Sequence, residues 1–340
     1  MATEINVTVV VTGASGHVGT NLVRRLLDSG RSVRAVVHKN RGLLEGHDVE
    51  WVPGDVTNRD SLRRAFTGAT TVFHLAALIS IEGDQGGLVT STNVEGAGNA
   101  AAAALECGVQ RYVHVSSVHA FDQNPLTEPL DEERSRALSP KHNAYDRSKA
   151  LGEARVKAVI AEGLNGVIVN PTGVIGPYDH QPSRMGQVFL DLYHRRLPSL
   201  IDGGFDWVDV RDVVAGILAA EDRGRRGENY LLSGHWRSVL DLATLAESVT
   251  GIRRPRIVSP MWLARGWAPF QMTIDRLMKR PLLYTSESLE ALRANRNISH
   301  EKATRELGYQ TRPIEESVRD IYAWFESAGL LGDGHAGEAK

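Results

Sequence analysis

The chain has 340 residues, of which 42% are hydrophobic and 24% are charged, as is usual for a soluble globular protein. Its formal net charge of −2 argues against partners bound by general electrostatic attraction, such as nucleic acid or an anionic membrane surface. The single cysteine, Cys107, excludes an internal disulfide and is typical of a reducing cytosol.

The N-terminal region shows no targeting signal. Residues 1–16 read MATEINVTVVVTGASG, in which an acidic residue precedes a β-branched run, with no basic segment or signal-peptide core. No apolar run in the sequence is long enough to span a bilayer. We therefore expect a cytoplasmic protein without stable membrane association.

The first half of the chain alternates strand and helix patterns. Near-continuous apolar runs predict strands at 6–13, 32–38, 49–55, 70–77, 111–117 and 166–173. Segments between them predict helices at 18–29, 58–67, 92–107 and 145–162. Apolar strands that alternate with helices are typical of a parallel sheet covered on both faces. The sequence thus predicts an α/β fold, with a Rossmann-type doubly wound parallel sheet in a nucleotide-binding domain over residues 1–176.

The remainder of the chain is less regular. Turns marked by Pro and Gly separate predicted helices at 184–196, 209–222, 239–250 and 286–294. We assign residues 177–331 mainly to a smaller substrate lobe, from which some strands and helices return to the core. Residues 332–340 read as a frayed tail.

Three glycines follow the first predicted strand, in the segment VTGASGHVG. Gly13 permits a tight turn, Gly16 lets the backbone approach a pyrophosphate, and Gly19 lets the helix pack on the strand. The N-terminus of the following helix offers free N–H groups to phosphates. Because the motif joins a strand to a helix at the start of the chain, it indicates a dinucleotide site.

The end of the second strand bears on the choice of cofactor. An acidic residue there accepts hydrogen bonds from the adenosine ribose, whereas basic residues accommodate a 2′-phosphate. This strand runs into His38, Lys39 and Arg41, which favours NADP(H) over NAD(H) unless the charges are only solvated loop residues. Asp55, at the end of the third strand, is a candidate either for the adenine amino group or for capping the next helix.

The segment NAYDRSKALGE places Tyr145 four residues before Lys149, on one face of a predicted helix. A phenol near an ammonium group is a candidate proton donor and acceptor, because the positive charge favours the phenolate. We expect the pKa of this phenol to lie well below its ordinary value of ~10. Because such a spacing also arises by chance, the interpretation of Tyr145 and Lys149 as an acid/base pair requires two more features. These are a cofactor site and a third side chain that takes part in the chemistry.

Eight segments together resemble an extended short-chain dehydrogenase/reductase, of the NAD-dependent epimerase/dehydratase superfamily, over nearly the whole chain. They are TGASGHVG (12–19), GDVTN (54–58), FHLAA (73–77), TNVEGAGN (92–99), VHVSS (113–117), YDRSK (145–149), NPTGVIGP (170–177) and WVDVRDVV (207–214). The segment from Trp207 onward is most similar to the dihydroflavonol-reductase and steroid-dehydrogenase branch.

The resemblance implies roles for four catalytic residues. Tyr145 matches the general acid/base, and Lys149 matches the residue that lowers its pKa and holds the nicotinamide ribose. Ser117 matches the hydroxyl that binds the substrate oxygen, with Ser116 as the alternative. Asn93 matches the asparagine that supports the lysine.

The resemblance also implies a cofactor groove. Pro171 and Thr172 match the segment that contacts the nicotinamide carboxamide, and Ala76 and Ala77 match small residues that line the groove. The predicted cofactor-binding set is Gly13, Ser15, Gly16, His17, Val18, Gly19, His38, Lys39, Arg41, Asp55, Val56, Leu75, Ala76, Ala77, Tyr145, Lys149, Pro171 and Thr172. No metal site is predicted.

Two departures from the family pattern bear on the reaction. A dehydratase carries an Asp–Glu pair after the active-site serine, where this chain has Val118 and His119. We expect His119 to be a surface or packing residue, with contact to the substrate as the alternative.

A nucleotide-sugar enzyme usually carries an arginine where this chain has Phe205 and Asp206. Three other arginines offer charge for a diphosphate: Arg184, Arg195 and Arg196.

Several segments remain open to more than one interpretation. The aromatic- and Met-rich stretch 261–283 predicts a lid over an apolar substrate, or a helix packed on the lobe or on a second subunit, with peripheral membrane contact as a third alternative. The polar loop 122–142 is expected to border the site entrance. Relatives pair through helices that match 92–107 and 145–162, which implies a homodimer.

These observations predict an NADP(H)-dependent oxidoreductase that reversibly reduces a carbonyl of a small, largely apolar substrate. The alternative within the same family is a nucleotide-sugar 4-epimerase. A non-catalytic NADP-sensing regulator is a more remote alternative, because such relatives usually lose the tyrosine or the lysine, and both are present here.

Overall fold

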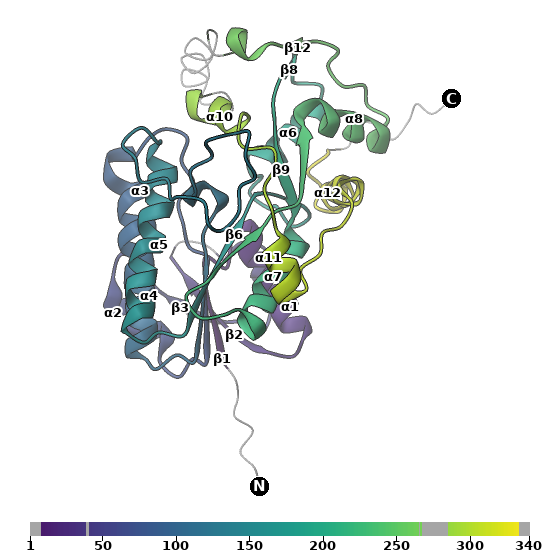
Figure 1. The fold of residues 1–340 in the computed structure, drawn as a ribbon. Coiled ribbons are helices and arrows are strands. Elements are labelled where there is room, and N and C mark those ends of the chain that lie inside the picture. Colours follow the sequence, from purple (N-terminus) through teal and green to yellow (C-terminus); the bar gives the residue numbers. More distant parts are fainter. Residues whose placement is uncertain (1–7, 39–40, 265, 267–284, 333–340) are drawn as a thin grey trace.

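Seven parallel strands form the central sheet of the computed structural model, which describes residues 8–38, 41–264, 266 and 285–332 (Figure 1). In spatial order the strands are β10 (Asn229–Leu232), β6 (Gly166–Pro171), β5 (Arg111–Val115), β4 (Thr71–His74), β1 (Thr8–Thr12), β2 (Ser32–Val37) and β3 (Glu50–Pro53). The predicted Rossmann-type sheet is confirmed. The six strands that were predicted all end within three residues of the expected positions.

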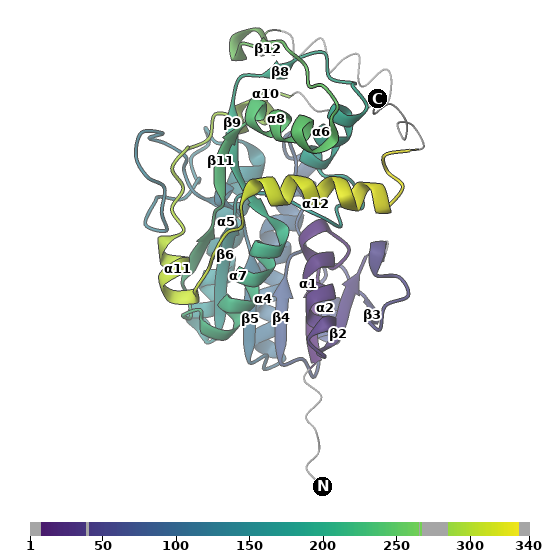
Figure 2. The ribbon, with the colours of Figure 1, turned by 90° about the vertical axis from the view of Figure 1, so that its right-hand side faces the viewer.

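Helices cover both faces of this sheet, as Figures 1 and 2 show. One face carries α1 (His17–Asp28), α7 (Val210–Arg223) and α11 (Glu301–Leu307). The other carries α2 (Arg59–Phe66), α4 (Gly96–Glu106) and α5 (Ala144–Glu162). Side chains alternate along β1, so Val9 and Val11 pack with the first set and Val10 packs with the second. Both faces are therefore buried, which explains the continuous apolar strands.

A second, smaller layer lies beyond the carboxyl ends of the strands (Figure 1). It contains a three-stranded sheet of β11 (His235–Ser238), β9 (Gly204–Asp209) and β7 (Gly173–Ile175), and a pair of β12 (Val258–Ser259) with β8 (Leu200–Ile201). Its helices are α6 (Arg184–Tyr193), α8 (Val239–Thr250), α10 (Ser286–Ala291) and α12 (Ile314–Ser327). Phe189, Trp207 and Phe325 fill its core.

Short helical turns connect these elements. They comprise 3₁₀ turns at Gly42–Leu44, Gln85–Gly87 and Val118–Ala120, the single turn α3 (Leu88–Thr90), and a π-helical turn at Ser91–Glu95 that runs into α4. The sequence did not predict this π turn, nor the strands of two to four residues such as β8 and β11, because they are too short to show a periodic pattern.

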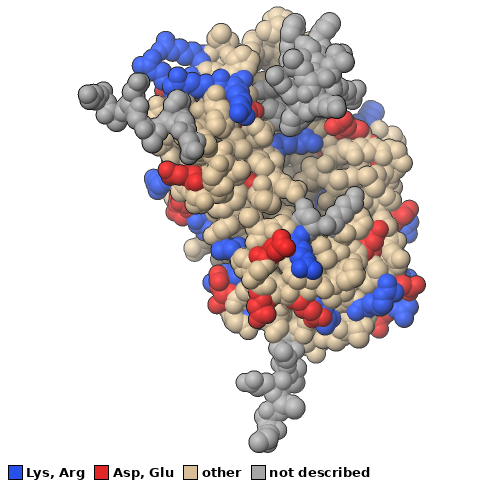
Figure 3. Space-filling model, turned by 180° about the vertical axis from the view of Figure 1, so that it is seen from behind, with Lys and Arg blue, Asp and Glu red and all other residues tan. Residues whose placement is uncertain are grey.

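The predicted lid at 261–283 lies mostly outside the described residues. In its described part, Met261 and Ala264 pack against Ile201 and Leu289, whereas Trp262 is 74% exposed. No helix among the residues placed in the structure has the length and hydrophobicity needed to cross a membrane. Figure 3 shows acidic and basic side chains interspersed over the lower part of one face, in keeping with the small net charge.

Gly152 on α5 offers a test of the packing between α5 and the π-helical turn that leads into α4. A Cβ atom at Gly152 would lie 2.4 Å from the backbone oxygen of Asn93, which cannot yield as a flexible side chain can. We expect Gly152→Ala to lower the free energy of unfolding by about 1–3 kcal/mol in urea titrations. Gly98→Ala is the matched control, because its Cβ would meet the side chain of Arg155 at 3.3 Å. An equal loss in both variants would contradict this packing argument.

Candidate active site

The predicted site residues gather at the carboxyl ends of the parallel strands. The strand order reverses between β1 and β4, and in open α/β sheets ligands bind in the crevice at such a point. Gly13 follows β1, Leu75 follows β4, and Ser117 lies two residues beyond β5. Tyr145 lies in the first turn of α5, where the side chain of Asn143 caps the helix.

The glycine turn has the geometry that a dinucleotide requires. Gly13 has a φ of +71°, and a Cβ there would lie 2.7 Å from the backbone nitrogen of Ala76. A Cβ at Gly19 would lie 2.1 Å from the oxygen of Gly13, so only glycine permits this approach of helix to turn. Gly16, the N-cap of α1, provides no side-chain cap, which leaves the helix N–H groups available for phosphate. These features fit a dinucleotide cofactor.

The residues predicted for the adenosine end lie beyond β2 and β3. His38 Nε2 is 3.7 Å from Asp55 Oδ2, and the Arg41 guanidinium lies 5.3 Å from the ring centroid of Trp51. Lys39 lies outside the described residues. Asp55 Oδ1 accepts hydrogen bonds from the backbone and hydroxyl of Thr57, which lower the pKa of this carboxyl.

The alternative role of Asp55 as a helix cap is wrong. The side chain of Asn58 caps α2 instead, through a hydrogen bond of 3.1 Å from the Ser61 backbone N–H.

Other predicted cofactor residues line the same edge. Ser15 and Ala77 are exposed, while His17, Val18, Val56, Leu75 and Ala76 are half-buried. His17 Nε2 donates to the oxygen of Pro177 at 3.0 Å, so this side chain ties α1 to the loop after β7. Pro171 ends β6, and the hydroxyl of Thr172 donates to Asp206 at 2.6 Å. Burial raises the pKa of Asp206 to about 6.

The structure brings Tyr145 and Ser117 together. The side chain of Ser117 lies near enough to the phenol of Tyr145 to lower its pKa, against the larger effect of burial. Ser117 Oγ also accepts from the backbone N–H of His119 at 3.2 Å. Ser116 Oγ is buried and has no hydrogen-bond partner among the described residues. The geometry thus favours Ser117 over Ser116 as the hydroxyl that works with Tyr145.

Lys149 is buried on the same face of α5, where its Nζ donates to the backbone oxygen of Val115 at 3.4 Å. Burial lowers the pKa of Lys149 to about 8, and the negative charge of Glu153 opposes that shift. Burial raises the pKa of Tyr145 to about 12, and the neighbouring side chain of Ser117 opposes that shift. The expected lowering of the tyrosine pKa is therefore wrong for this structure, because loss of hydration outweighs the lowering effects of Ser117 and of the positive charge of Arg184.

Asn93 occupies the π-helical turn before α4. Its Nδ2 donates to the oxygen of Leu78 and to Ser148 Oγ, both at 2.9 Å, and its Oδ1 accepts from the Leu78 backbone N–H at 2.8 Å. The side chain therefore joins the loop after β4 to α5. The support of Lys149 by Asn93 stays a prediction, since among the described residues the Asn93 side chain bonds to Leu78 and Ser148.

Glu153 is a site residue that the sequence analysis missed. Its carboxylate is buried and accepts hydrogen bonds from Asn170, from Asn229 at 3.1 Å and from Arg136 at 3.1 Å. Glu153 follows Lys149 by four residues, so the helical spacing that linked Tyr145 to Lys149 was the signal that could have found it. The charges of Lys149 and Arg136 balance the buried carboxylate.

His119 was expected to be a packing or surface residue, and the structure places it in the site. Its ring lies edge-on to Tyr145 at 5.5 Å between centroids and stacks on Phe205 at 5.7 Å. Its Nδ1 is 2.9 Å from Asp146 Oδ1. Because 27 residues separate His119 from Asp146, no local pattern predicts this pair.

Arg184, at the start of α6, also faces this region. Its positive charge acts to lower the pKa of Tyr145. The negative charges of Glu82 and Glu287 act to raise the pKa of the Arg184 guanidinium. Burial lowers the pKa of Arg184, and its Nη1 has no hydrogen-bond partner among the described residues. Of the three arginines considered in the sequence, Arg196 instead lies 3.8 Å from Asp191 on α6.

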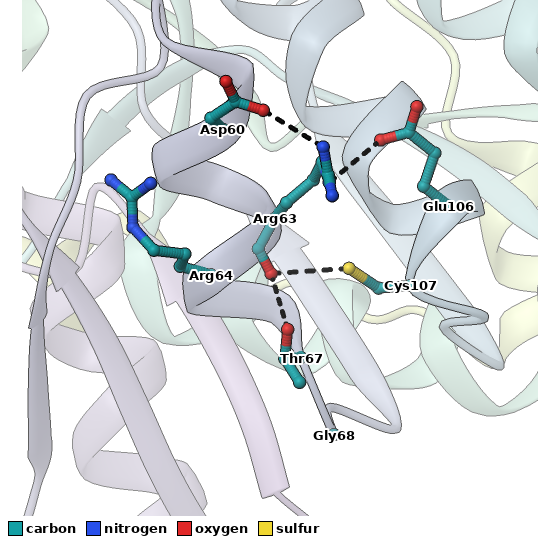
Figure 4. A pocket seen from close by; sticks show the side chains of 7 residues that line it. All are labelled: Asp60, Arg63, Arg64, Thr67, Gly68, Glu106 and Cys107. Atoms are coloured by element: carbon teal, nitrogen blue, oxygen red, sulfur yellow. Dashed lines mark hydrogen bonds and ion pairs between the residues drawn. The ribbon is translucent and has the colours of Figure 1, made fainter.

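A separate surface hollow of about 430 Å³ lies between the C-terminal ends of α2 and α4 (Figure 4). These helix ends lead into the amino ends of β4 and β5, on the opposite side of the sheet from Tyr145. Arg63 pairs there with Asp60 at 3.1 Å and with Glu106 at 3.6 Å. Burial raises the pKa of the nearby Cys107 thiol. The hollow therefore takes no part in the chemistry at Tyr145.

Comparison with known proteins assigns the family. A model of the NAD dependent epimerase/dehydratase family matches residues 9–233. The chain belongs to this family. It is 35% identical to "Sterol demethylase protein B" of Methylococcus capsulatus, over 95% of this chain and 100% of that protein. It is 31% identical to a Synechocystis sp. protein provisionally named a dihydroflavonol 4-reductase, over 94% of this chain and 95% of that protein.

The crystal structure of gox2253 superposes with a TM-score of 0.82 at 31% identity, over 95% of this chain and 99% of that one. The predicted extended short-chain dehydrogenase/reductase family and the dihydroflavonol-reductase-like branch are thereby confirmed. The protein is an NAD(P)-dependent enzyme of this type.

Burial of Lys149 predicts a pH-dependent stability. With a pKa of about 8 in the folded protein, against 10.5 ordinarily, this group binds fewer protons in the folded than in the unfolded state between these pH values. The free energy of unfolding therefore rises over this range, by up to about 3 kcal/mol. Urea unfolding should show this rise to be absent from Lys149→Met and present in the exposed control Lys141→Met. Equal rises in both variants would contradict the assigned pKa.

Proposed function

We propose that the enzyme reversibly reduces the carbonyl group of a largely apolar small molecule with NADP(H), and that Tyr145 is the general acid/base. The observation that carries this proposal is the proximity of the Ser117 and Tyr145 side chains, beside the buried Lys149 and next to a glycine turn suited to a dinucleotide. The cofactor, when bound, supplies or accepts the hydride.

The residues of the chain have distinct tasks in this reaction. The phenol of Tyr145, held protonated by burial, donates its proton to the oxygen that gains charge as the carbonyl is reduced. The hydroxyl of Ser117 holds the same oxygen by a second hydrogen bond. Lys149 contributes positive charge that is fixed in place before the reaction, because Glu153 and the Val115 carbonyl hold it.

Several features favour an apolar substrate over a nucleotide-sugar. Phe205 and Trp207 on β9 are buried against each other, and Phe205 stacks on His119. Asp206 between them is bonded to Thr172 and the Gly234 backbone. An acid and an aromatic side chain thus stand where a nucleotide-sugar enzyme usually carries a cation. Two relatives described above are named for a sterol and a dihydroflavonol, which are polycyclic and largely apolar.

The preference for NADP(H) is supported by the residues beyond β2. His38 and Arg41 are exposed there, and the acidic residue next to them, Asp55, is engaged with Thr57. Arg41 stacks near Trp51, which orients a guanidinium at the edge where a 2′-phosphate of the adenosine would lie.

Removing the phenolic hydroxyl of Tyr145 tests the mechanism. We expect Tyr145→Phe to leave cofactor binding nearly unchanged and to lower turnover by ~10²–10⁴-fold, because the proton donor is lost. The assay follows nicotinamide absorbance with 1-tetralone, 4-chromanone and a 3-ketosteroid, and with UDP-glucose as the nucleotide-sugar. Tyr112→Phe is the control, since its buried hydroxyl has no hydrogen-bond partner among the described residues. Turnover that survives in Tyr145→Phe would refute the assignment.

Arg41 tests the choice of cofactor. Loss of a charge-assisted hydrogen bond to a 2′-phosphate should raise the KM for NADPH in Arg41→Ala by about ten-fold or more. The KM for NADH should stay nearly constant, because that cofactor lacks the phosphate. Arg64→Ala, an exposed arginine on α2, serves as the control. An equal change of both KM values in Arg41→Ala would count against an NADP(H) preference.

A further inference from the structure

Four large apolar side chains are exposed close together on the substrate lobe. Ile257 and Val258 lie at β12, and Trp262 and Leu263 lie on the helical turn that follows Pro260. They make up four of the ten large hydrophobic side chains that are exposed in the part of the chain that the structure describes. Single exposed apolar residues are ordinary, whereas several together mark a surface that binds a partner.

Hydrogen bonds fix this surface to the lobe. β12 pairs with β8, where the Leu200 backbone N–H donates to the Ile257 oxygen at 2.9 Å. The Ala264 N–H donates to the Pro260 oxygen at 3.1 Å, and the Ala264 side chain packs on Ile201. Figures 1 and 2 both place β12 at the end of the molecule opposite the amino ends of the central strands. The surface can therefore meet a flat partner without a clash from the central sheet.

Arginines border the apolar side chains. Arg253 and Arg256 are exposed and pair with no acidic side chain of the described chain, while Arg254 lies 3.6 Å from Glu247. In the sequence, residues 253–280 contain seven Lys or Arg and one Asp, although the whole chain has a formal net charge of −2. Figure 3 shows basic side chains gathered at this end of the molecule. The positive charge is therefore local, and the net charge of the chain does not reveal it.

Apolar side chains next to unpaired arginines match an anionic lipid membrane. Trp is favoured at the boundary between lipid headgroups and acyl chains, and arginine is attracted to acidic headgroups. A second copy of the chain fits less well, because a two-fold contact would bring the arginines of both copies together. Asp202, whose N–H donates to the Ser259 oxygen at 3.0 Å, is an exposed acidic neighbour, but Arg253 and Arg256 outnumber it.

We propose that residues 253–264 form a surface by which the enzyme docks reversibly on an anionic lipid membrane. Arg253 and Arg256 attract the phosphate-bearing headgroups, and Trp262 and Leu263 insert at the boundary with the acyl chains. Docking of this kind needs no membrane-spanning helix. A largely apolar substrate dissolves in the bilayer, so docking brings the substrate lobe to the place where that substrate is concentrated.

Sedimentation with lipid vesicles tests the proposal. The full-length protein is mixed with vesicles of phosphatidylcholine alone, and with vesicles of equal parts phosphatidylcholine and phosphatidylglycerol. We expect the protein to bind the mixed vesicles and to bind pure phosphatidylcholine far more weakly. Binding should decrease between ~0.1 M and ~1 M NaCl, because the screening length falls from ~10 Å to ~3 Å.

Paired variants separate the two contributions to binding. Arg253→Ser with Arg256→Ser should lower the partition onto mixed vesicles ~30-fold, since each basic residue near an anionic surface contributes a factor of ~5. Trp262→Ser with Leu263→Ser should lower it ~10-fold or more, because apolar surface no longer enters the bilayer. Three matched controls should bind like the wild type: Arg253→Lys with Arg256→Lys, Trp262→Phe with Leu263→Met, and Arg64→Ser on α2. Urea unfolding checks that every variant is folded.

A wild-type protein that stays in the supernatant with mixed vesicles would overturn the proposal. Equal binding by the wild type and either serine pair would overturn it as well, because both contributions are required. Light scattering tests the contact between two copies. A wild-type dimer that Trp262→Ser with Leu263→Ser converts to a monomer, without vesicle binding by the wild type, would assign the surface to that contact instead. Vesicle binding does not depend on turnover, so this result stands apart from the test of ketone reduction.

Discussion

The burial of two charged side chains, Lys149 and Glu153, on the face of α5 that carries Tyr145 is the constraint on which the site depends. Tyr145, Lys149 and Glu153 follow one another at four-residue intervals, and Lys149 and Glu153 are both nearly inaccessible to solvent. A charge buried without a partner is strongly destabilising, so these groups fix each other and their surroundings. Asn170, Asn229 and Arg136 complete the pairing, which ties α5 to β6, β10 and the loop after β5.

The packing of α5 in the core therefore fixes the position of Tyr145. Gly152, on the next turn of the helix from Lys149, lets α5 approach the backbone of Asn93, and Asn93 in turn holds the loop after β4. The cofactor groove, the serine beyond β5 and the tyrosine are therefore positioned by one set of contacts. Rigid support of this kind is what a site needs in order to stabilise charge without reorganising.

The sequence predicted those parts of the molecule that depend on local pattern. The six leading strands, the glycine turn and the Tyr145–Lys149 spacing are properties of short windows, and the structure places them as expected. The network around Glu153 joins positions up to 76 residues apart, and the return of β10 to the central sheet is equally non-local. The packing of His119 against Phe205 and Tyr145 is non-local in the same way. The pKa of Tyr145 was misjudged because burial, which no sequence pattern gives, outweighs the nearby charge.

A crystal structure of the enzyme with NADP⁺ and a bound ketone would test the central claim most directly, because it shows which side chains hold the carbonyl oxygen. Our account predicts that this oxygen lies within ~3 Å of both Tyr145 Oη and Ser117 Oγ, at hydrogen-bond distance. A ketone oxygen bound to Arg184 or to a backbone group, away from the hydroxyl groups of Tyr145 and Ser117, would contradict it.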